Sequence, residues 1–346
     1  MMLFNKYILR SVALIILLIP FIIVLILDYL TVPDLEESAK YVDVIIPRGA
    51  SIQAIADSLI AKKLIDDKKL FLFWVTTLEK DRSLKAGYYE IPMGLTYAQL
   101  VTYLSTARSK QIKVTLIEGW RIERIALELE NQLDIDRELF IGLTQDPEFI
   151  RDLDLELESL EGYLLPDTYY FYWGMDEIQL VRFLVDRCLA VFDSTVTARL
   201  DSIKMTRHEI LTLASIIEGE AIFDDERSTI SSVYHNRLKK RIKLQADPTI
   251  QYILEGPPRR LLYKDLETDS PYNTYKYYGL PPGPINNPGK KSILAAAYPA
   301  NTKYLYFVAR GDGRHNFSFT AKDHAKAKAE FNRVRREVYR KQKQNK

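Results

Sequence analysis

The sequence predicts an α+β protein behind a single N-terminal transmembrane helix. Three observations predict this fold class: an uncharged apolar stretch near the N-terminus, a strand-turn-helix pattern that occurs three times before residue 130, and mixed helical and strand-like segments after residue 205. The chain has 346 residues, of which 47% are hydrophobic and 27% are charged, so it is long enough for two or three folded domains.

The N-terminal stretch at residues 12–27 contains no charged residue. With its apolar flanks it supplies about 18 helical residues, which at about 1.5 Å per residue nearly cross a hydrocarbon core of about 30 Å. Basic residues precede it and acidic residues follow it, which predicts a cytoplasmic N-terminus. A cleaved signal peptide is the alternative, but no small-residue cleavage site follows. We therefore expect residues 1–32 to form a cytoplasmic N-terminus and an anchor. The protein would be single-pass in the cytoplasmic (inner) membrane, with a periplasmic or extracytoplasmic main domain.

The repeated pattern covers residues 46–59, 91–104 and 116–129, which align without a gap. Each copy reads as a strand end, a glycine turn and a helix with apolar residues at positions i, i+3 and i+7. These copies resemble small LysM-like modules, which bind glycan in bacterial cell walls. We expect a LysM-like module at residues 40–108, and a mere spacer is the alternative.

Composition excludes several classes of function. The 48 basic and 46 acidic residues leave a formal net charge of +2, so the chain has no field that would attract nucleic acid. Only residues 322–346 are strongly basic, and we interpret this helix as a solvated face, with weak attraction to anionic polymers or lipid as the alternative. Apolar neighbours favour a buried position for the single cysteine, Cys188. The four histidines are not in a zinc-binding arrangement, and there is no G-x-S-x-G motif.

The segment "LASIIEGEA" places two glutamates, Glu218 and Glu220, at the end of an apolar helix that opens with a capping box at Thr206. Each glutamate has apolar neighbours on its own face, so burial can raise its pKa and make it a general acid. The alternative is that one glutamate is solvated and the other pairs with Arg227 or Arg237. Periodicity does not choose between them.

Other polar groups follow. Gly219 lies inside the helix, where glycine is unfavourable, which indicates a close approach of backbone or ligand. We expect "LQADPTIQY" to be an extended segment ended by Pro248. A loop rich in tyrosine, asparagine, proline and glycine, residues 270–289, suits the recognition of sugar hydroxyls, although these residues can also simply stiffen a loop. The aromatic run at residues 169–173 predicts a packed strand. Glycosidic chemistry is the function that these residues favour.

Seven motifs occur in order: "LASIIEGEA", "ERSTISSVYHNRL", "LQADPTIQY", "DLETDSPYNTYKYYGLPPGPINNPG", "AAAYPA", "YLYFVARG" and "HNFSFTAKDH". With "LEGYLLPDTY" upstream, they resemble the endolytic murein transglycosylases, or YceG-like family, over nearly the whole chain. The resemblance implies a YceG-like catalytic domain at residues 109–346. It also implies cleavage of the MurNAc–GlcNAc bond of nascent peptidoglycan without water, leaving 1,6-anhydro-MurNAc ends and terminating strand elongation.

We expect no cofactor and no metal. Expected partners are glycan strands, the cytoplasmic membrane and penicillin-binding proteins. The first alternative is a non-catalytic peptidoglycan-binding scaffold. The second is a hydrolase of the same bond, in which Asp247 would hold the attacking water.

Residue roles follow from the same resemblance. Glu218 is implied as the catalytic acid and base, which protonates the leaving oxygen and takes the proton of the C6 hydroxyl that closes onto C1. Two positions depart from the family, which often has lysine at Gly219 and threonine at Ala246. Motif membership and chemistry together predict the substrate-binding residues Glu220, Asn236, Gln245, Asp247, Tyr252, Tyr272, Asn273, Tyr275 and Asn287.

Overall fold

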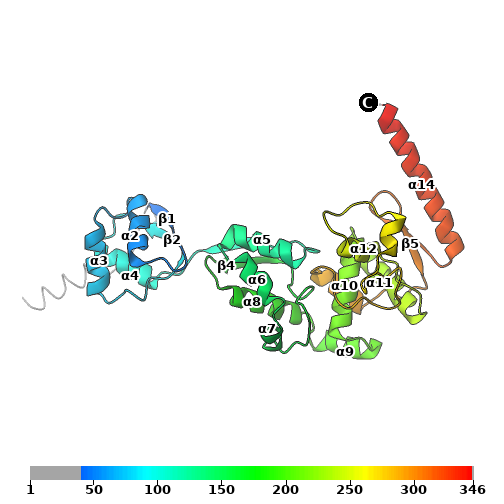
Figure 1. Cartoon of the computed structure of the whole chain (residues 1–346), viewed down its shortest axis with the longest axis horizontal. Coiled ribbons are helices and arrows are strands. Elements are labelled where there is room, and N and C mark those ends of the chain that lie inside the picture. Colours follow the sequence, from blue (N-terminus) through cyan, green and yellow to red (C-terminus); the bar gives the residue numbers. More distant parts are fainter. Residues whose placement is uncertain (1–39, 345–346) are drawn as a thin grey trace, which may run out of the picture. The chain divides into compact units, whose positions relative to one another are not determined.

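The computed structural model describes residues 40–344, which form a mixed α+β structure of helices and small sheets (Figure 1). The α+β class is therefore confirmed. The chain divides into two compact units. The first contains the described residues up to Lys113 together with Gln132–Asp134 and Tyr170–Met175, and the second contains Val114–Asn131, Ile135–Tyr169 and the chain from Asp176 onward.

The first unit is built on two antiparallel strands, in which Tyr41 pairs with Pro92 and Ile46 with Gly87. Alternate residues of a strand face the same side, so Val44 and Ile46 both point into an apolar core. Its elements are β1 (Tyr41–Ile46), α2 (Ile52–Ala61), α3 (Lys68–Thr77), β2 (Gly87–Pro92) and α4 (Tyr97–Thr106).

The three predicted strand-turn-helix copies are confirmed. Gly49, Gly94 and Gly119 have φ angles of +67°, +88° and +80°, which residues with a Cβ rarely adopt. In each copy a strand precedes the glycine and a helix follows it: β1 and α2, β2 and α4, then β3 (Gln111–Thr115) and α5 (Ile122–Leu133).

The remaining elements begin with α6 (Arg137–Leu143), α7 (Pro147–Arg151), β4 (Thr168–Tyr172), α8 (Glu177–Leu189) and α9 (Ser194–Ile203). Strand β4 confirms the strand predicted from the aromatic run, and it forms a two-stranded sheet with β3. Cys188 on α8 is fully buried and unpaired, as expected.

Helix α10 (Arg207–Glu220) forms the centre of the second unit. Its residues from Ile210 to Ile217 are all buried, and the predicted capping box at Thr206 is present. The helix packs against α11 (Asp224–Lys239), α12 (Asp247–Ile253) and α13 (Lys290–Ala297). Strand β5 (Tyr306–Ala309) pairs antiparallel with β6 (His315–Ser318), and the predicted terminal helix, α14 (Ala321–Gln344), packs against both strands. A short 3-10 helix, η1, covers Tyr263–Glu267.

Two predictions are wrong for the described residues. The segment around Pro248 is not extended, because α12 begins at Asp247 and proline is well tolerated in the first turn of a helix. No helix among residues 40–344 is both long and apolar enough to cross a membrane, which contradicts the predicted membrane localisation. The stretch on which that prediction depended, residues 12–27, lies outside the described residues.

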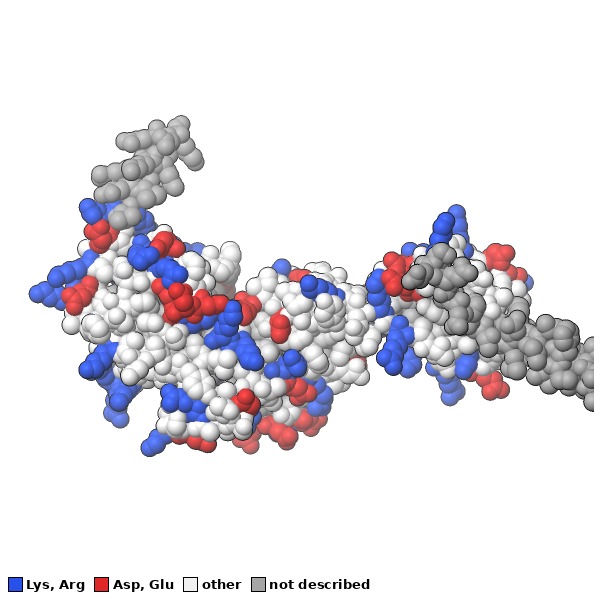
Figure 2. Space-filling view, turned by 180° about the vertical axis from the view of Figure 1, so that it is seen from behind, with Lys and Arg blue, Asp and Glu red and all other residues white. Residues whose placement is uncertain are grey.

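Surface charge agrees with the composition. On the face shown in Figure 2, basic and acidic side chains are interspersed and do not gather in a large patch of one sign. This face therefore has no extended basic surface of the kind that nucleic-acid binding needs.

Candidate active site

The two glutamates of α10 enter different environments. Residues two apart on a helix do not share a face, so Glu218 and Glu220 point in different directions from the same helical turn. Glu218 enters a cluster of charged residues, whereas Glu220 lies on the wall of a cavity.

Glu218 is held by an ion pair. Its Oε1 accepts a hydrogen bond from Nη1 of Arg227 at 2.9 Å, and its Oε2 accepts one from the backbone N–H of Gly289 at 3.0 Å. Both charged side chains are nearly buried, with 6% and 7% of their surface exposed. Arg227 also binds Asp224, at 3.0 Å, and lies 3.7 Å from Glu118. Glu218 thus has the arginine partner that the sequence left open as an alternative.

Glu220 has a different set of neighbours. The hydroxyl of Tyr234, a residue on α11, donates a hydrogen bond to its Oε1 at 3.1 Å. Burial raises the pKa of Glu220 to about 7, and the nearby carboxylate of Asp247 acts in the same direction. The Tyr234 hydrogen bond and Arg237 lower this pKa by smaller amounts. A carboxyl group with such a pKa can give and take a proton near neutral pH.

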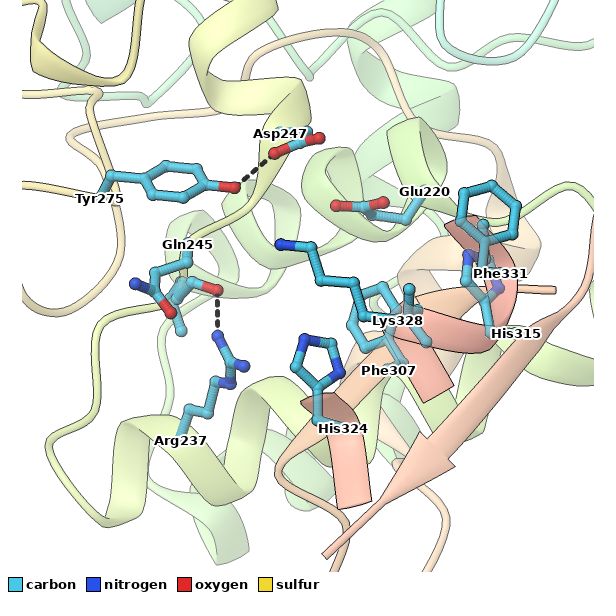
Figure 3. A pocket seen from close by; sticks show the side chains of 13 residues that line it. Glu220, Arg237, Gln245, Asp247, Tyr275, Phe307, His315, His324, Lys328 and Phe331 are labelled. Atoms are coloured by element: carbon cyan, nitrogen blue, oxygen red, sulfur yellow. Dashed lines mark hydrogen bonds between the residues drawn. The ribbon is translucent and has the colours of Figure 1, made fainter. Parts of the chain in front are cut away.

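The cavity beside Glu220 has a volume of about 460 Å³ (Figure 3). Asp247 lies on its wall at the first position of α12, and the Tyr275 hydroxyl donates a hydrogen bond to this carboxylate. Gln245 has a left-handed backbone with a φ of +49°, a conformation that costs some energy for a residue other than glycine. The lining residues are Glu220, Arg237, Leu244, Gln245, Asp247, Tyr275, Phe307, Val308, Ala309, His315, His324, Lys328 and Phe331.

Gly219 explains how the two carboxyl groups come together. A β-carbon at Gly219 would lie only 2.7 Å from Cβ of Pro248, closer than real side chains approach. The glycine therefore lets the first turn of α12 pack against the last turn of α10, which places Asp247 beside Glu220. A close approach of backbone or ligand was predicted from this glycine; a close approach is present, but it is made by the side chain of Pro248.

Four of the predicted site residues line the same cavity: Glu220, Gln245, Asp247 and Tyr275. The three predicted asparagines do not line it, and their side-chain amides are used inside the fold. Asn236 donates to the carbonyls of Thr302 and Tyr304. Asn273 and Asn287 are fully buried and bind backbone groups of neighbouring loops.

Two predicted aromatic residues form a separate pair. The rings of Tyr252 and Tyr272 are 4.8 Å apart, and the Arg121 guanidinium lies over Tyr252 at 4.4 Å from the ring centroid. Neither tyrosine lines the cavity beside Glu220.

Sequence reasoning missed several residues of the cavity. Arg237 belongs to the motif "ERSTISSVYHNRL" but was not assigned to the site, and neither was Tyr234 of the same motif, which does not line the cavity but donates a hydrogen bond to Glu220. His324, Lys328 and Phe331 come from α14, which was interpreted as a solvated helix. Their spacing of i, i+4 and i+7 places them on one face, and this spacing is the signal that could have found them.

A carboxyl group with a pKa near 7, beside a second carboxylate in a polar cavity, is typical of enzymes that cleave glycosidic bonds. Residues 44–330 match the YceG-like family. Because this match covers most of the chain, the protein belongs to the YceG-like family.

Two similar proteins are named as endolytic murein transglycosylases. The chain is 34% identical over 314 residues to the "Endolytic murein transglycosylase" of Bacillus subtilis (strain 168), which covers 86% of this chain and 87% of that protein. It is 29% identical to the protein of the same name from Streptococcus pneumoniae serotype 2 (strain D39), and it spans 59% of that longer protein. The crystal structure of a YceG-like protein from Listeria monocytogenes matches with a TM-score of 0.58 and 35% identity, covering 83% of this chain and 98% of that chain.

Proposed function

We propose that the protein is an endolytic peptidoglycan lytic transglycosylase that cleaves the MurNAc–GlcNAc bond and leaves 1,6-anhydro-MurNAc ends. Family membership and the names of the relatives support the reaction class. The proposal depends on one observation. The pKa of Glu220 is raised to about 7, and this residue lines a polar cavity together with Asp247. One carboxyl group suffices for this reaction if it can act first as acid and then as base.

We assign the acid and base role to Glu220. Glu218, which the family resemblance implies for this role, does not line the cavity, and its oxygens are occupied by Arg227 and by the Gly289 amide. Glu220 accepts one hydrogen bond, from Tyr234, and faces the space where a sugar can bind. A catalytic role of Glu218 stays a prediction, and product analysis of variants at both glutamates tests it.

The proposed reaction needs no water. Protonated Glu220 gives its proton to the glycosidic oxygen as the bond from C1 of MurNAc to that oxygen breaks. The C6 hydroxyl of the same MurNAc then bonds to C1 and releases its proton to the Glu220 carboxylate. This internal hydroxyl acts at a high effective concentration. Asp247, held by Tyr275, would stabilise the positive charge that develops on the sugar ring.

The test is a product analysis by mass spectrometry after incubating glycan strands with the full-length chain. We expect anhydro ends from the wild type and a loss of about 10²- to 10⁴-fold for Glu220→Gln. Glu218→Gln is the matched control on the same helical turn, and it should still produce anhydro ends. Loss of cleavage in Glu218→Gln with activity kept in Glu220→Gln would reverse the assignment.

The same experiment separates the competing functions. Reducing ends in place of anhydro ends would favour a hydrolase, with Asp247 holding water. Binding of strands without any cleavage by the wild type would favour a non-catalytic scaffold.

Two finer features belong to the proposal. The strand-turn-helix copies support a LysM-like module within residues 40–108, which would bind the glycan strand. Termination of strand elongation would bring the protein to penicillin-binding proteins, which synthesise the strands. Co-purification of the wild-type chain with such a synthase tests this partnership.

A further inference from the structure

The last helix contributes a wall of the candidate active site. His324, Lys328 and Phe331 of α14 all line the cavity beside Glu220. Packing of α14 against β5 and β6 fixes this face of the helix. In Figure 3 the Lys328 side chain points into the cavity toward Glu220 and Asp247. A segment whose charges suggested a solvated surface therefore supplies a cation to the site.

The two cations of the cavity differ in what they bind. The Arg237 guanidinium donates hydrogen bonds to the backbone carbonyls of Leu305 and Leu244, at 2.6 and 2.7 Å, and to that of Lys243 at 3.2 Å. Only 7% of Arg237 is exposed. Lys328 is exposed and takes part in no salt bridge within residues 40–344. Arg237 thus has a structural role, while the Lys328 ammonium can bind a ligand.

His324 gives a second, independent observation on the same wall. Its ring stacks on Tyr306, with centroids 5.3 Å apart and an angle of 25° between the planes, so the ring is held in one orientation. Its Nδ1 atom is buried and has no hydrogen-bond partner among the described residues. His324 also lines the cavity that Lys328 enters, so a group bound beside Lys328 would lie next to this ordered ring.

The chemistry of the substrate identifies the ligand. The sugar rings of a peptidoglycan strand are neutral, and its negative charges are carboxylates on the lactyl group or on the peptide stem. A lysine ammonium forms a charge-assisted hydrogen bond with such a group. We propose that Lys328 and His324 form a subsite for a carboxylate of the glycan strand, which places the scissile bond opposite Glu220. This inference rests on the proposed function.

Two steady-state experiments test the subsite in the full-length chain. Lys328→Gln removes the charge and keeps a similar length. Lys326→Gln is the matched control, because Lys326 is exposed on the same helix and does not line the cavity. We expect Lys328→Gln to lower kcat/KM by about threefold to tenfold, mainly through a higher KM, as for a binding contact made equally in ground and transition states. Lys326→Gln should match the wild type.

Three substrates identify the source of the carboxylate. They are strands with peptide stems, strands whose stems have been removed to expose the lactyl carboxylate, and the latter strands with that carboxylate converted to a methylamide. A defect confined to stem-bearing strands assigns the subsite to a stem carboxylate. A defect on bare strands that disappears after amidation assigns it to the lactyl carboxylate.

The inference would be overturned if Lys328→Gln lowered kcat/KM equally on all three substrates. It would also be overturned if Lys328→Gln lowered kcat/KM on none of them. Equal defects would mean that the lysine serves the catalytic carboxyl groups. Strand affinity measured by calorimetry in the Glu220→Gln background separates this result from a failure of the proposed function, because binding needs no turnover. A loss of affinity for carboxylate-bearing strands in Lys328→Gln, with unchanged affinity in Lys326→Gln, supports the subsite even if the reaction class differs.

Discussion

Glu218 and Glu220 are two residues apart on α10, yet they lie beside groups of opposite charge. Glu218 pairs with the cation Arg227, whereas Glu220 lies near the carboxylate of Asp247. The neighbouring anion disfavours the charged form of the Glu220 carboxyl group and contributes to its raised pKa. The ion pair therefore suits a structural role, and the carboxyl pair suits proton transfer.

A third carboxyl group shows that a raised pKa alone does not define an acid catalyst. Burial raises the pKa of Glu161 to about 8, a larger shift than that of Glu220. Glu161 is 7% exposed, and its oxygens accept hydrogen bonds from Asn287 and from the backbone of Ile122. It does not line the cavity. Exposure to the cavity therefore distinguishes Glu220 from Glu161.

Removal of the cation from the ion pair should have the largest effect. Arg227→Met leaves Glu218 buried beside Glu118 without its partner, and we expect the free energy of unfolding to fall by about 3–5 kcal/mol. Urea unfolding at pH 7 measures this change. Arg227→Lys keeps the charge and should lose clearly less. A loss below about 1 kcal/mol in Arg227→Met would show that the ion pair does not hold this part of the fold.

A substitution at Glu220 should instead increase the free energy of unfolding. Its pKa is raised from 4.5 to about 7 on folding, so between these values the native state binds more protons than the unfolded state. The free energy of unfolding of the wild type therefore falls as the pH rises through this window. Glu220→Gln cannot ionise, so it should gain about 1–3 kcal/mol relative to the wild type between pH 4.5 and pH 8.

Urea unfolding of both proteins at pH 4.5 and pH 8 measures the relative gain. Glu218→Gln is the control and should show no such gain, because it loses the ion pair with Arg227. A pH-independent difference between Glu220→Gln and the wild type would mean that Glu220 is not desolvated in the native state.

Local patterns predicted the parts of this fold that depend on neighbouring residues. The glycine turns at Gly49, Gly94 and Gly119 and the capping box at Thr206 follow from short segments. Even the packing contact at Gly219 could be predicted, because glycine inside a helix indicates a close approach.

The partners of the site residues could not be predicted in this way. Asn287 looked like a sugar-binding amide, but its side chain bonds to backbone groups more than 100 residues away in the chain. Lys328 looked solvated because its spacing with His324 and Phe331 indicates a shared helix face but not the cavity that this face borders. Periodicity gives the face of a helix but not what lies opposite, so it left Glu218 and Glu220 equivalent.

The smallest predicted effect concerns the hydrogen bond that the Tyr234 hydroxyl donates to Glu220. As the proposed general acid, Glu220 must be protonated, so kcat/KM of the wild type should fall about tenfold per pH unit above a pKa of about 7. The Tyr234 hydroxyl lowers that pKa by donating to the carboxylate. Tyr234→Phe removes the donor, so the pKa should rise and the alkaline limb of the profile should move to higher pH by less than about one unit.

The pH profile separates this electrostatic role from a structural one, because a loss of packing lowers kcat/KM at every pH without moving the limb. Activity of Tyr234→Phe at pH 8 should therefore decrease less, relative to its own maximum, than that of the wild type. Glu218→Gln should keep the wild-type limb, since Glu218 lies in the other environment. If the limb moved in Glu218→Gln and stayed in Tyr234→Phe, the titrating acid would belong to the ion cluster, and the two glutamates would exchange the roles assigned to them.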